Sequence, residues 1–317
     1  MEYIKIEYTN PIYPKKLLEI KNPPKELYIL GNYELLNKKY TVAIIGSREC
    51  TEYGRKYAYY FSQELSKKDI CIVSGLAIGI DAIAHIGATE NIGRTIAVLG
   101  GGFNKFYPKE NEWLFHKILE NNGCIITEHA PNVEPDKRNF PKRNKIVSGL
   151  ADITLVIEAE YRSGTSITAG YAKEQSRIIC AIPGNLENSR SIGTNKLIKE
   201  GAQLVTSPDE IIEILENKEE YKIKQDNKRS SIKESQNRKI TNNKKVEIIL
   251  SKETIKKEIP KEYEEIYNII KEKPIHINNI CKITKKTMQE ISAIVTMLEL
   301  EGLVENLPGN EIKIKEE

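Results

Sequence analysis

Hydrophobic residues between about residue 40 and residue 216 form short runs that are separated by stretches of helix length. Most of these runs are continuously apolar rather than alternating, which is typical of strands buried on both faces of a parallel sheet. The predicted strands are Thr41–Ile45, Ile70–Val73, Thr95–Leu99, Cys124–Thr127, Ile153–Ile157, Ile178–Ile182 and Gln203–Val205. The predicted helices are Tyr53–Lys67, Asp81–Asn91, Asn111–Asn121, Arg143–Leu150, Ser166–Gln175, Asn195–Glu200 and Asp209–Asn217.

Strands that alternate with helices in this way predict right-handed βαβ units, and hence a doubly wound, mainly parallel α/β sheet with helices on both faces. Ligands of such sheets bind outside the carboxyl ends of the strands. The turns that follow the predicted strands are therefore the first place to look for functional residues.

The pattern divides the chain into four segments. Residues 1–39 are polar and interrupted by prolines, and we expect a short lead-in that packs on the Rossmann-like domain of residues 40–217. Residues 218–258 are rich in Lys, Asn, Ser and Glu, which predicts a flexible linker. Residues 259–317 read as three short helices followed by a β-hairpin, the outline of a winged helix. A small protein-contact or capping domain is the alternative for this last segment.

The charge of the chain is unevenly distributed. Its net charge is only +3, yet residues 218–245 hold ten Lys and Arg against four Asp and Glu, about +6. The remainder is therefore slightly acidic. A nucleic-acid site on the folded body must be a local patch, because the body has no general basic coat.

Cysteine usage and hydropathy point to the cytosol. The five cysteines are scattered, odd in number and without a CxxC pair, which favours reduced thiols over a disulfide framework or a zinc site. The amino terminus lacks the apolar core of a signal peptide, and no run reaches the ~18 apolar residues of a membrane span. We expect a cytoplasmic protein with no membrane association.

Standard catalytic signatures are missing from the sequence. There is no G-x-x-x-x-G-K-[ST] loop, no G-x-G-x-x-G and no G-x-S-x-G, and the four histidines share no metal-binding spacing. We therefore expect a non-catalytic binding protein on a dinucleotide-type fold, without a cofactor or a metal.

Several predicted strands end in turns that suit an anion. Gly46-Ser47-Arg48 follows the first strand and offers backbone N–H groups, a hydroxyl and a guanidinium. We interpret this turn as functional, because tight geometry alone does not require the arginine. For the turn at residues 74–81 we favour geometry alone, with Asp81 as the helix cap and His85 as a core histidine. At the start of a later helix, Ser163, Gly164, Thr165 and Ser166 form an additional candidate phosphate contact.

A second candidate element combines an aromatic ring with cations. Phe140 interrupts the basic segment at residues 137–145, and Pro141 at a helix start holds the ring in a defined position. Tyr107-Pro108-Lys109 is a similar turn after the third strand. Both elements are expected at the same sheet edge as Arg48. Rings beside cations suit single-stranded nucleic acid, whose bases are free to stack.

An ordered series of motifs carries a family resemblance. Its members are Val42–Arg48, Ser74–His85, Thr95–Gly102 with Tyr107-Pro108, Phe140-Pro141-x-Arg143-Asn144, Ser163–Ala169, Ala181-x-Pro183-Gly184, Gly193-Thr194-Asn195-x-Leu197-Ile198 and Gly201-Ala202. Over residues 10 to 210 the chain resembles the DNA processing protein A (DprA/Smf) family, and its tail resembles the winged helix that many members carry. The resemblance implies an extended Rossmann fold, a homodimer, single-stranded DNA binding and loading of the RecA recombinase in natural transformation.

The resemblance also assigns roles to residues. It implies phosphate contacts for Gly46, Ser47, Arg48, Lys137 and Arg143, base stacking for Phe140, a further cation at Lys109 and a loop-bracing role for Asn144.

One enzymatic alternative stays open. The turn at residues 163–165 could hold a nucleotide phosphate near Glu158, as in the Rossmann-type, lysine decarboxylase-like phosphoribohydrolases. The Pro-Gly-Gly-x-Gly-Thr loop of that group is not present, so we prefer the binding protein.

Overall fold

The computed structural model describes residues 2–160, 163–230, 263–300, 303–307 and 309–315 of the chain. The chain forms two compact units, residues 1–239 and residues 240–317. Each unit has its own core.

The first unit is built on a nine-stranded sheet. Its strands are β1 (Ile4–Glu7), β2 (Glu26–Gly31), β3 (Thr41–Ile45), β4 (Cys71–Ser74), β5 (Thr95–Val98), β6 (Cys124–Thr127), β7 (Ile153–Val156), β8 (Ile178–Ala181) and β9 (Gln203–Leu204). They lie in the order β1-β2-β6-β5-β4-β3-β7-β8-β9. Strands β3 to β9 are parallel, and β1 and β2 are antiparallel additions at one edge. The predicted doubly wound, mainly parallel α/β fold is confirmed.

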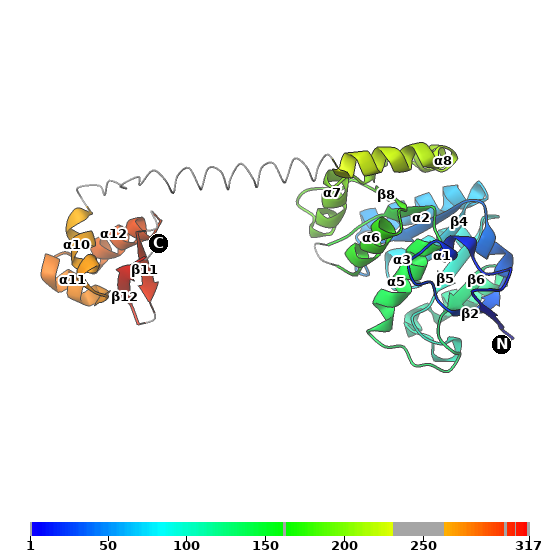
Figure 1. The fold of residues 1–317 in the computed structure, drawn as a ribbon, viewed down its shortest axis with the longest axis horizontal. Helices are drawn as coiled ribbons and strands as arrows, with labels where there is room; N and C mark the ends of the chain where they lie inside the picture. Colours follow the sequence, from blue (N-terminus) through cyan, green and yellow to red (C-terminus); the bar gives the residue numbers. More distant parts are fainter. Residues whose placement is uncertain (1, 161–162, 231–262, 301–302, 308, 316–317) are drawn as a thin grey trace. The chain divides into compact units, whose positions relative to one another are not determined.

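Helices cover both faces of this sheet (Figure 1). They are α1 (Lys15–Leu18), α2 (Glu52–Lys67), α3 (Ile80–Thr89), α4 (Glu112–Glu120), α5 (Asn139–Gly149), α6 (Gly164–Glu174), α7 (Ile192–Lys199) and α8 (Pro208–Glu216). Short 3₁₀ turns are η1 (Tyr33–Asn37), η2 (Phe103–Lys105), η3 (Lys109–Asn111) and η4 (Ser189–Ser191). In β3, Val42 and Ile44 join the core beneath α2, α3 and α8, whereas Ala43 and Ile45 join the core beneath α5. The strand is apolar from Val42 to Ile45 because successive side chains enter opposite cores.

The direction of winding reverses next to β3. The chain runs from β3 outward through β4, β5 and β6, and then returns to place β7 on the other side of β3. The register pairs Ile45 with Val156, so β3 and β7 end together. Connections leave the two strands in opposite directions, and a crevice opens at this switch point.

The amino-terminal segment is part of the sheet rather than a lead-in packed against it. Residues 28–31 of β2 pair with residues 124–127 of β6, and β1 adds outside β2. Tyr13 is buried, and its hydroxyl donates a hydrogen bond of 2.7 Å to the Pro24 carbonyl. The expected boundary at residue 39 therefore does not separate two structural units, because β2 completes the edge that β6 would otherwise expose.

The segment that was predicted as a flexible linker begins with a helix. Residues 218–230 are helical, and the buried Gln225 side chain accepts a hydrogen bond from Ile179 N (3.1 Å) and donates one to Ile179 O (2.9 Å). Strand β9 is only two residues long and pairs only with Cys180 and Ala181 of β8, so the Gln225 amide satisfies the backbone of Ile179. Residues 231–258 of the expected linker lie outside the described residues.

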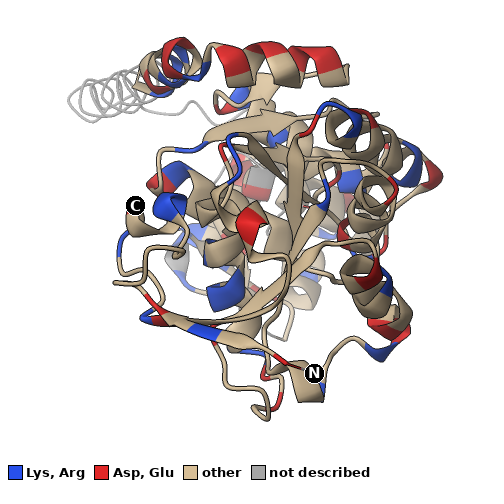
Figure 2. Cartoon of the chain, turned by 90° about the vertical axis from the view of Figure 1, so that its right-hand side faces the viewer, with Lys and Arg blue, Asp and Glu red and all other residues tan. Residues whose placement is uncertain are grey.

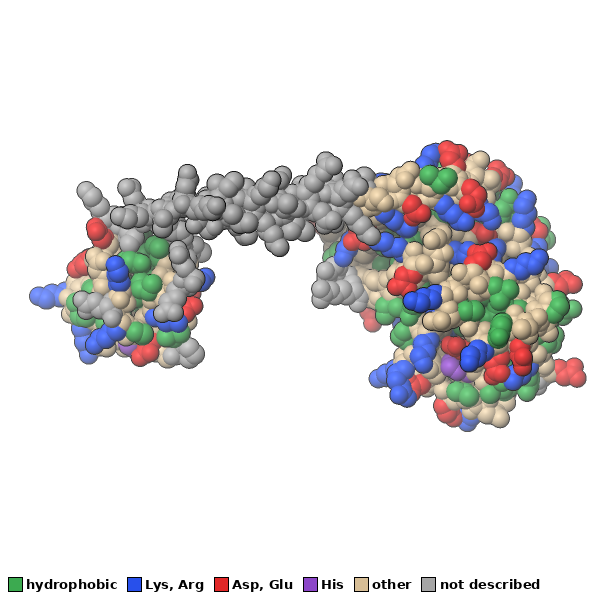
Figure 3. Space-filling model, viewed as in Figure 1, with side chains coloured by type: hydrophobic (Ala, Val, Ile, Leu, Met, Phe, Trp, Pro, Cys, Tyr) green, Lys and Arg blue, Asp and Glu red, His purple; other side chains and the backbone are tan. Residues whose placement is uncertain are grey.

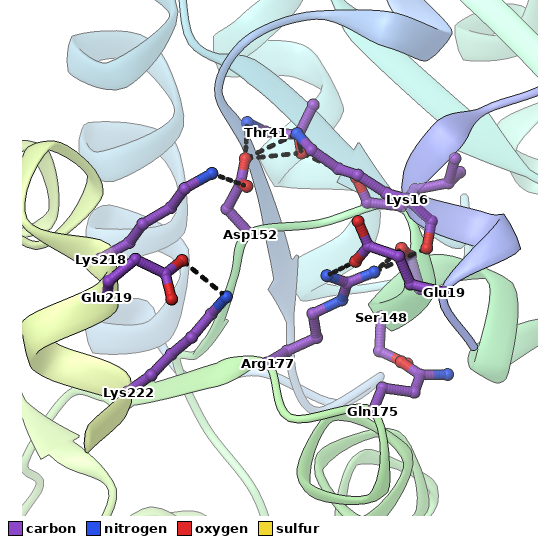
Figure 4. Close-up of polar contacts among 12 residues, drawn as sticks. Lys16, Glu19, Thr41, Ser148, Asp152, Gln175, Arg177, Lys218, Glu219 and Lys222 are labelled. Atoms are coloured by element: carbon purple, nitrogen blue, oxygen red, sulfur yellow. Dashed lines mark hydrogen bonds and ion pairs between the residues drawn. The ribbon is translucent and has the colours of Figure 1, made fainter. Parts of the chain in front are cut away.

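A polar network joins three distant segments at the amino ends of β3 and β7 (Figure 4). The Asp152 carboxylate lies 2.6 Å from Lys16 Nζ and 3.2 Å from Lys218 Nζ, and it accepts a hydrogen bond of 2.9 Å from Thr41 N. These cations lower the pKa of Asp152 even though its burial acts in the opposite direction. The network fixes α1 and the helix after α8 against the sheet.

The second unit is a small α/β module. It contains α10 (Glu264–Glu272), β10 (Ile275–His276), α11 (Ile277–Thr284), α12 (Met288–Leu300), β11 (Val304–Leu307) and β12 (Glu311–Ile314). Its antiparallel sheet has the order β10-β12-β11. Ile266, Ile280, Ile291 and Val304 bring all three helices and the hairpin into one core. The predicted winged helix is confirmed.

Candidate functional site

A cleft of about 440 Å³ lies at the switch point of the sheet. Its walls are the turn after β3, the loop between β4 and α3, the first turns of α5 and the amino end of α6. The lining residues are Ile45, Gly46, Ser47, Arg48, Glu49, Gly75, Ala77, Asp81, Phe140, Arg143, Asn144, Val147, Glu160, Ser163, Gly164, Thr165 and Thr168. The structure thus brings together the two elements that the sequence placed about a hundred residues apart.

The turn after β3 is held in place by the residues at the start of α3. Gly79 has a φ of +85°, and a Cβ atom at this position would collide with the carbonyl oxygens of Ser47 and Arg48. The amide of Ile80 donates a hydrogen bond of 3.2 Å to Ser47 O. Arg48 itself is exposed and makes no ion pair with a described residue. The turn is therefore fixed while its guanidinium remains available to a ligand.

Phe140 lies on the first turn of α5, directly beside Arg48. The Arg48 Cζ atom is 5.9 Å from the centre of the Phe140 ring, a cation–π geometry. The ring packs on Gly100, where an added Cβ would come within 2.7 Å of the ring atom Cδ1. Phe140 is half-buried. Its ring lines the cleft instead of filling the hydrophobic core.

Arg143 differs from the expected phosphate contact. It is buried at 5% exposure, and its Nη1 atom donates to the carbonyl oxygens of Gly75 and Val98, the latter at 2.6 Å. Its Nε atom donates to Asn144 Oδ1 at 3.1 Å, so the Asn144 side chain supports the guanidinium. Burial lowers the pKa of Arg143 to about 10, against the opposing effect of Asp81. The guanidinium ties the ends of β4 and β5 to α5.

The amino end of α6 forms the opposite wall. Ser163, Gly164 and Thr165 line the cleft, and a Cβ atom at Gly164 would meet nothing within 4 Å. The first N–H groups of a helix have no intrahelical partner and favour an anion. Ser166 instead lines a separate groove with Lys173 and Arg229, so it lies outside the candidate site.

Two predicted cations lie outside the lining. Lys109 belongs to η3, is exposed and lies 3.4 Å from Glu112 Oε1. Lys137 is exposed in the loop before α5. Neither side chain lines the cleft, so both are in reach only of a ligand that extends beyond it.

Glu158 does not face the cleft. It is buried at 1% exposure, and its carboxylate accepts hydrogen bonds from Thr51 N (3.0 Å) and from the Thr51 hydroxyl. Gly54 leaves room for this carboxylate, because a Cβ atom there would collide with it. Glu158 thus holds the amino end of α2.

Sequence reasoning missed two acidic residues of the cleft, Glu49 and Glu160, and expected Asp81 only as a helix cap. Glu49 and Glu160 line it, and Arg190 lies 3.2 Å from Glu49 and 4.0 Å from Glu160. Asp81 accepts a hydrogen bond of 3.1 Å from Gly75 N, and burial raises its pKa. Glu49 and Glu160 lie in the turns that follow β3 and β7, so the rule that ligands bind at the carboxyl ends of strands could have identified them. Asp81 lies instead in the first turn of α3, where Gly79 is the residue at the N-cap. Charges of both signs are interspersed over the first unit (Figures 2 and 3), which agrees with a local rather than a general basic surface.

The described residues contain no helix that is long and apolar enough to cross a bilayer. They also contain no group of three or more His, Cys, Asp or Glu side chains that could hold a metal ion.

A cleft with an exposed arginine and an aromatic ring lies at the switch point of a doubly wound sheet, and the chain also carries a winged helix. This combination is typical of Rossmann-like proteins that suit nucleic acid. Residues 5–216 match the family model described as DNA recombination-mediator protein A, and residues 252–310 match the DprA winged helix domain. The chain belongs to the DNA recombination-mediator protein A (DprA/Smf) family.

Individual relatives agree with this assignment. The chain is 43% identical over 200 residues to the DNA processing protein DprA of Streptococcus pneumoniae, covering 63% of this chain and 70% of that protein. It is 41% identical over 204 residues to Protein Smf of Escherichia coli, covering 64% of this chain and 54% of that protein. The match therefore spans only about half the length of the Escherichia coli protein.

Solved structures of two family members resemble the first unit. The DprA structure from Streptococcus pneumoniae has a TM-score of 0.63 at 40% identity, covering 67% of this chain and 74% of that one. A structure of Helicobacter pylori DNA processing protein A, described by its unique single-stranded DNA binding mode, has a TM-score of 0.62 at 32% identity and covers 68% of this chain and 97% of that one.

Proposed function

We propose that this chain binds and protects incoming single-stranded DNA in the switch-point cleft and loads the RecA recombinase in natural transformation and recombination, without catalysing a reaction. The observation that carries the proposal is the position of the Arg48 guanidinium beside the Phe140 ring in one cleft. A cation next to a stacking platform matches the repeating unit of an unpaired strand, which alternates phosphate with base.

Each wall of the cleft has a chemical role in this proposal. The Gly46 and Ser47 amides and the Arg48 guanidinium hold one phosphate, and the amino end of α6 holds a second. Phe140 stacks on a base. Arg143 supports the floor, because its own hydrogen bonds go to backbone carbonyls.

The strand continues beyond the cleft. Lys109 and Lys137 are exposed and add phosphate contacts for nucleotides on either side. Stacking requires a base face that a duplex conceals, so the site prefers single strands. The relative from Helicobacter pylori, which is described as binding single-stranded DNA, supports the same ligand.

Family membership supports the partners that we propose. They are RecA and a second copy of the chain, and a RecA partner implies a cytoplasmic location. We propose both partners from the resemblance, without assigning a surface to either.

A phosphoribohydrolase activity receives less support. Both Glu158 oxygens lie in a buried site at Thr51, whereas a catalytic carboxylate must reach the substrate. Incubation with AMP and assay of released adenine tests this alternative. Turnover that Glu158→Gln abolishes would favour the enzyme.

A titration distinguishes the proposed function most simply. Fluorescence anisotropy with oligo-dT and with a duplex of equal length, each at two salt concentrations, compares the two ligands. We expect tighter binding of oligo-dT and affinity that falls with salt. Equal affinity for single and double strands contradicts the proposal.

A further inference from the structure

A small hollow adjoins the cleft, and the Phe140 ring lines both. Its lining residues are Arg48, Gly75, Ala77, Ile78, Tyr107, Pro108, Phe140 and Arg143. Five of these, Arg48, Gly75, Ala77, Phe140 and Arg143, also line the cleft, so the two depressions form one continuous surface. The residues that are new to the hollow are apolar or aromatic: Ile78, Tyr107 and Pro108.

The two large new side chains are exposed. Tyr107 is 52% exposed and Ile78 is 43% exposed. The Tyr107 hydroxyl makes no hydrogen bond with a described residue, and its ring lies against the Phe140 ring. An exposed ring next to an apolar side chain offers contact area to a flat, apolar face.

The distance between the Tyr107 and Phe140 rings determines how a base can stack on them. The centres of the Tyr107 and Phe140 rings lie 5.7 Å apart with an angle of 43° between the planes. Stacked bases are spaced by about 3.4 Å, so a base inserted between two rings needs roughly 7 Å. The rings are too close to enclose one base. They form two neighbouring platforms that meet at an angle.

We propose that Tyr107 is a second base platform, and that the hollow between Tyr107 and Ile78 takes the nucleobase next to the one on Phe140. The proposal rests on the proposed function of the cleft. Arg48 belongs to both depressions, so the phosphate that links the two nucleotides lies at its guanidinium. Successive bases on successive rings are a general mode of single-strand binding.

Tyr107→Ala and Tyr107→Phe test the platform by fluorescence anisotropy on oligo-dT. Tyr107→Ala should weaken binding about 5- to 150-fold, the range for one stacked base, while Tyr107→Phe keeps the wild-type affinity because stacking needs only the ring. Tyr8→Ala is the matched control, since Tyr8 is 51% exposed and lines neither depression.

A strand of abasic nucleotides separates stacking from other effects. It keeps the phosphates but has no bases, so Tyr107→Ala and wild type should bind it equally. Wild-type affinity of Tyr107→Ala for oligo-dT, or an equal loss on the abasic strand, overturns the second platform.

The same series separates this inference from the proposed function. If Arg48→Ala weakens binding and Tyr107→Ala does not, the result supports DNA binding in the cleft and contradicts the role of Tyr107 as a second platform. If wild type does not bind oligo-dT, both fail.

Discussion

The Arg48 guanidinium lies 5.9 Å from the centre of the Phe140 ring, although one residue follows β3 and the other begins α5. The turn that carries Arg48 is held by Gly79, and the ring is supported by Gly100. Both side chains are therefore positioned before any ligand arrives. Pre-organised contacts of this kind increase affinity, because less conformational freedom is lost on binding.

Replacement of Arg143 should affect stability more than ligand contact. Arg143→Met removes the donor to the Gly75 and Val98 carbonyls and leaves the Asp81 carboxylate without its compensating charge. Loss of a buried charged partner lowers the free energy of unfolding by about 3–5 kcal/mol. Urea denaturation measures this loss. Arg48→Ala, at an exposed position, should leave the unfolding midpoint unchanged, and equal destabilisation by both variants would contradict these roles.

His85 should make stability depend on pH. Its side chain is fully buried with Nδ1 2.7 Å from the Thr95 hydroxyl, and burial, aided by the charge of Arg143, lowers its pKa to about 3. The unfolded state, with a pKa near 6.5, takes up a proton first, so stability is intact above about pH 6.5 and decreases as the pH falls toward 3. Between pH 7 and pH 5 we expect a loss of about 2 kcal/mol from this residue.

The difference between wild type and His85→Gln isolates the effect of this histidine. Urea denaturation of both proteins at pH 7 and pH 5 gives the comparison. An identical pH dependence in the two proteins would show that His85 accepts a proton in the folded state.

Asp152 should be required for the attachment of the helix after α8. Asp152→Asn keeps the size of the side chain but removes the charge that Lys16 and Lys218 share. We expect the free energy of unfolding to fall by roughly 2–3 kcal/mol, below the full value for a buried pair because both lysines reach solvent. Asp226→Asn, at an exposed carboxylate that pairs with Arg229, is the control and should change stability little. Equal stability of wild type and Asp152→Asn would contradict this role.

The basic tail should add affinity without specificity. Truncation after residue 230 removes the winged helix and a segment with a local excess of Lys and Arg, but it keeps Lys218 and Gln225 in place. We expect oligo-dT binding to weaken modestly and to depend less on salt. Truncation after residue 217 should also destabilise the first unit. Complete loss of binding in the longer form would place the main site on the tail.

The sequence predicted the sheet and the meeting of Arg48 with Phe140 well, for physical reasons. Doubly buried strands read as apolar runs, and the carboxyl ends of parallel strands share one edge. The burial of Arg143 could not be predicted in this way, because Lys142, Arg143 and Lys145 look alike as cations. Only the start of α5 at Asn139, four residues earlier than expected, puts Arg143 on the same helix face as Phe140.

The remaining features lie in polar segments, whose composition does not indicate them. Gln225 lies in a stretch whose composition is typical of a linker, yet it is buried because β9 is short. The amino-terminal strands escaped notice because β1, at the sheet edge, has only one buried residue. Composition reports the average polarity of a segment. The burial of a single side-chain amide and the pairing of one edge strand depend instead on neighbours that the fold brings together.

One titration series tests the central claim most directly: oligo-dT binding by wild type, Arg48→Ala, Phe140→Ala and the double variant, with Arg55→Ala as an exposed control outside the cleft. Each single change should weaken binding, by ~1–3 kcal/mol for the stacking residue. The two effects should be non-additive, because the side chains are in contact and share one ligand. Wild-type affinity of the double variant would show that single-stranded DNA is bound elsewhere.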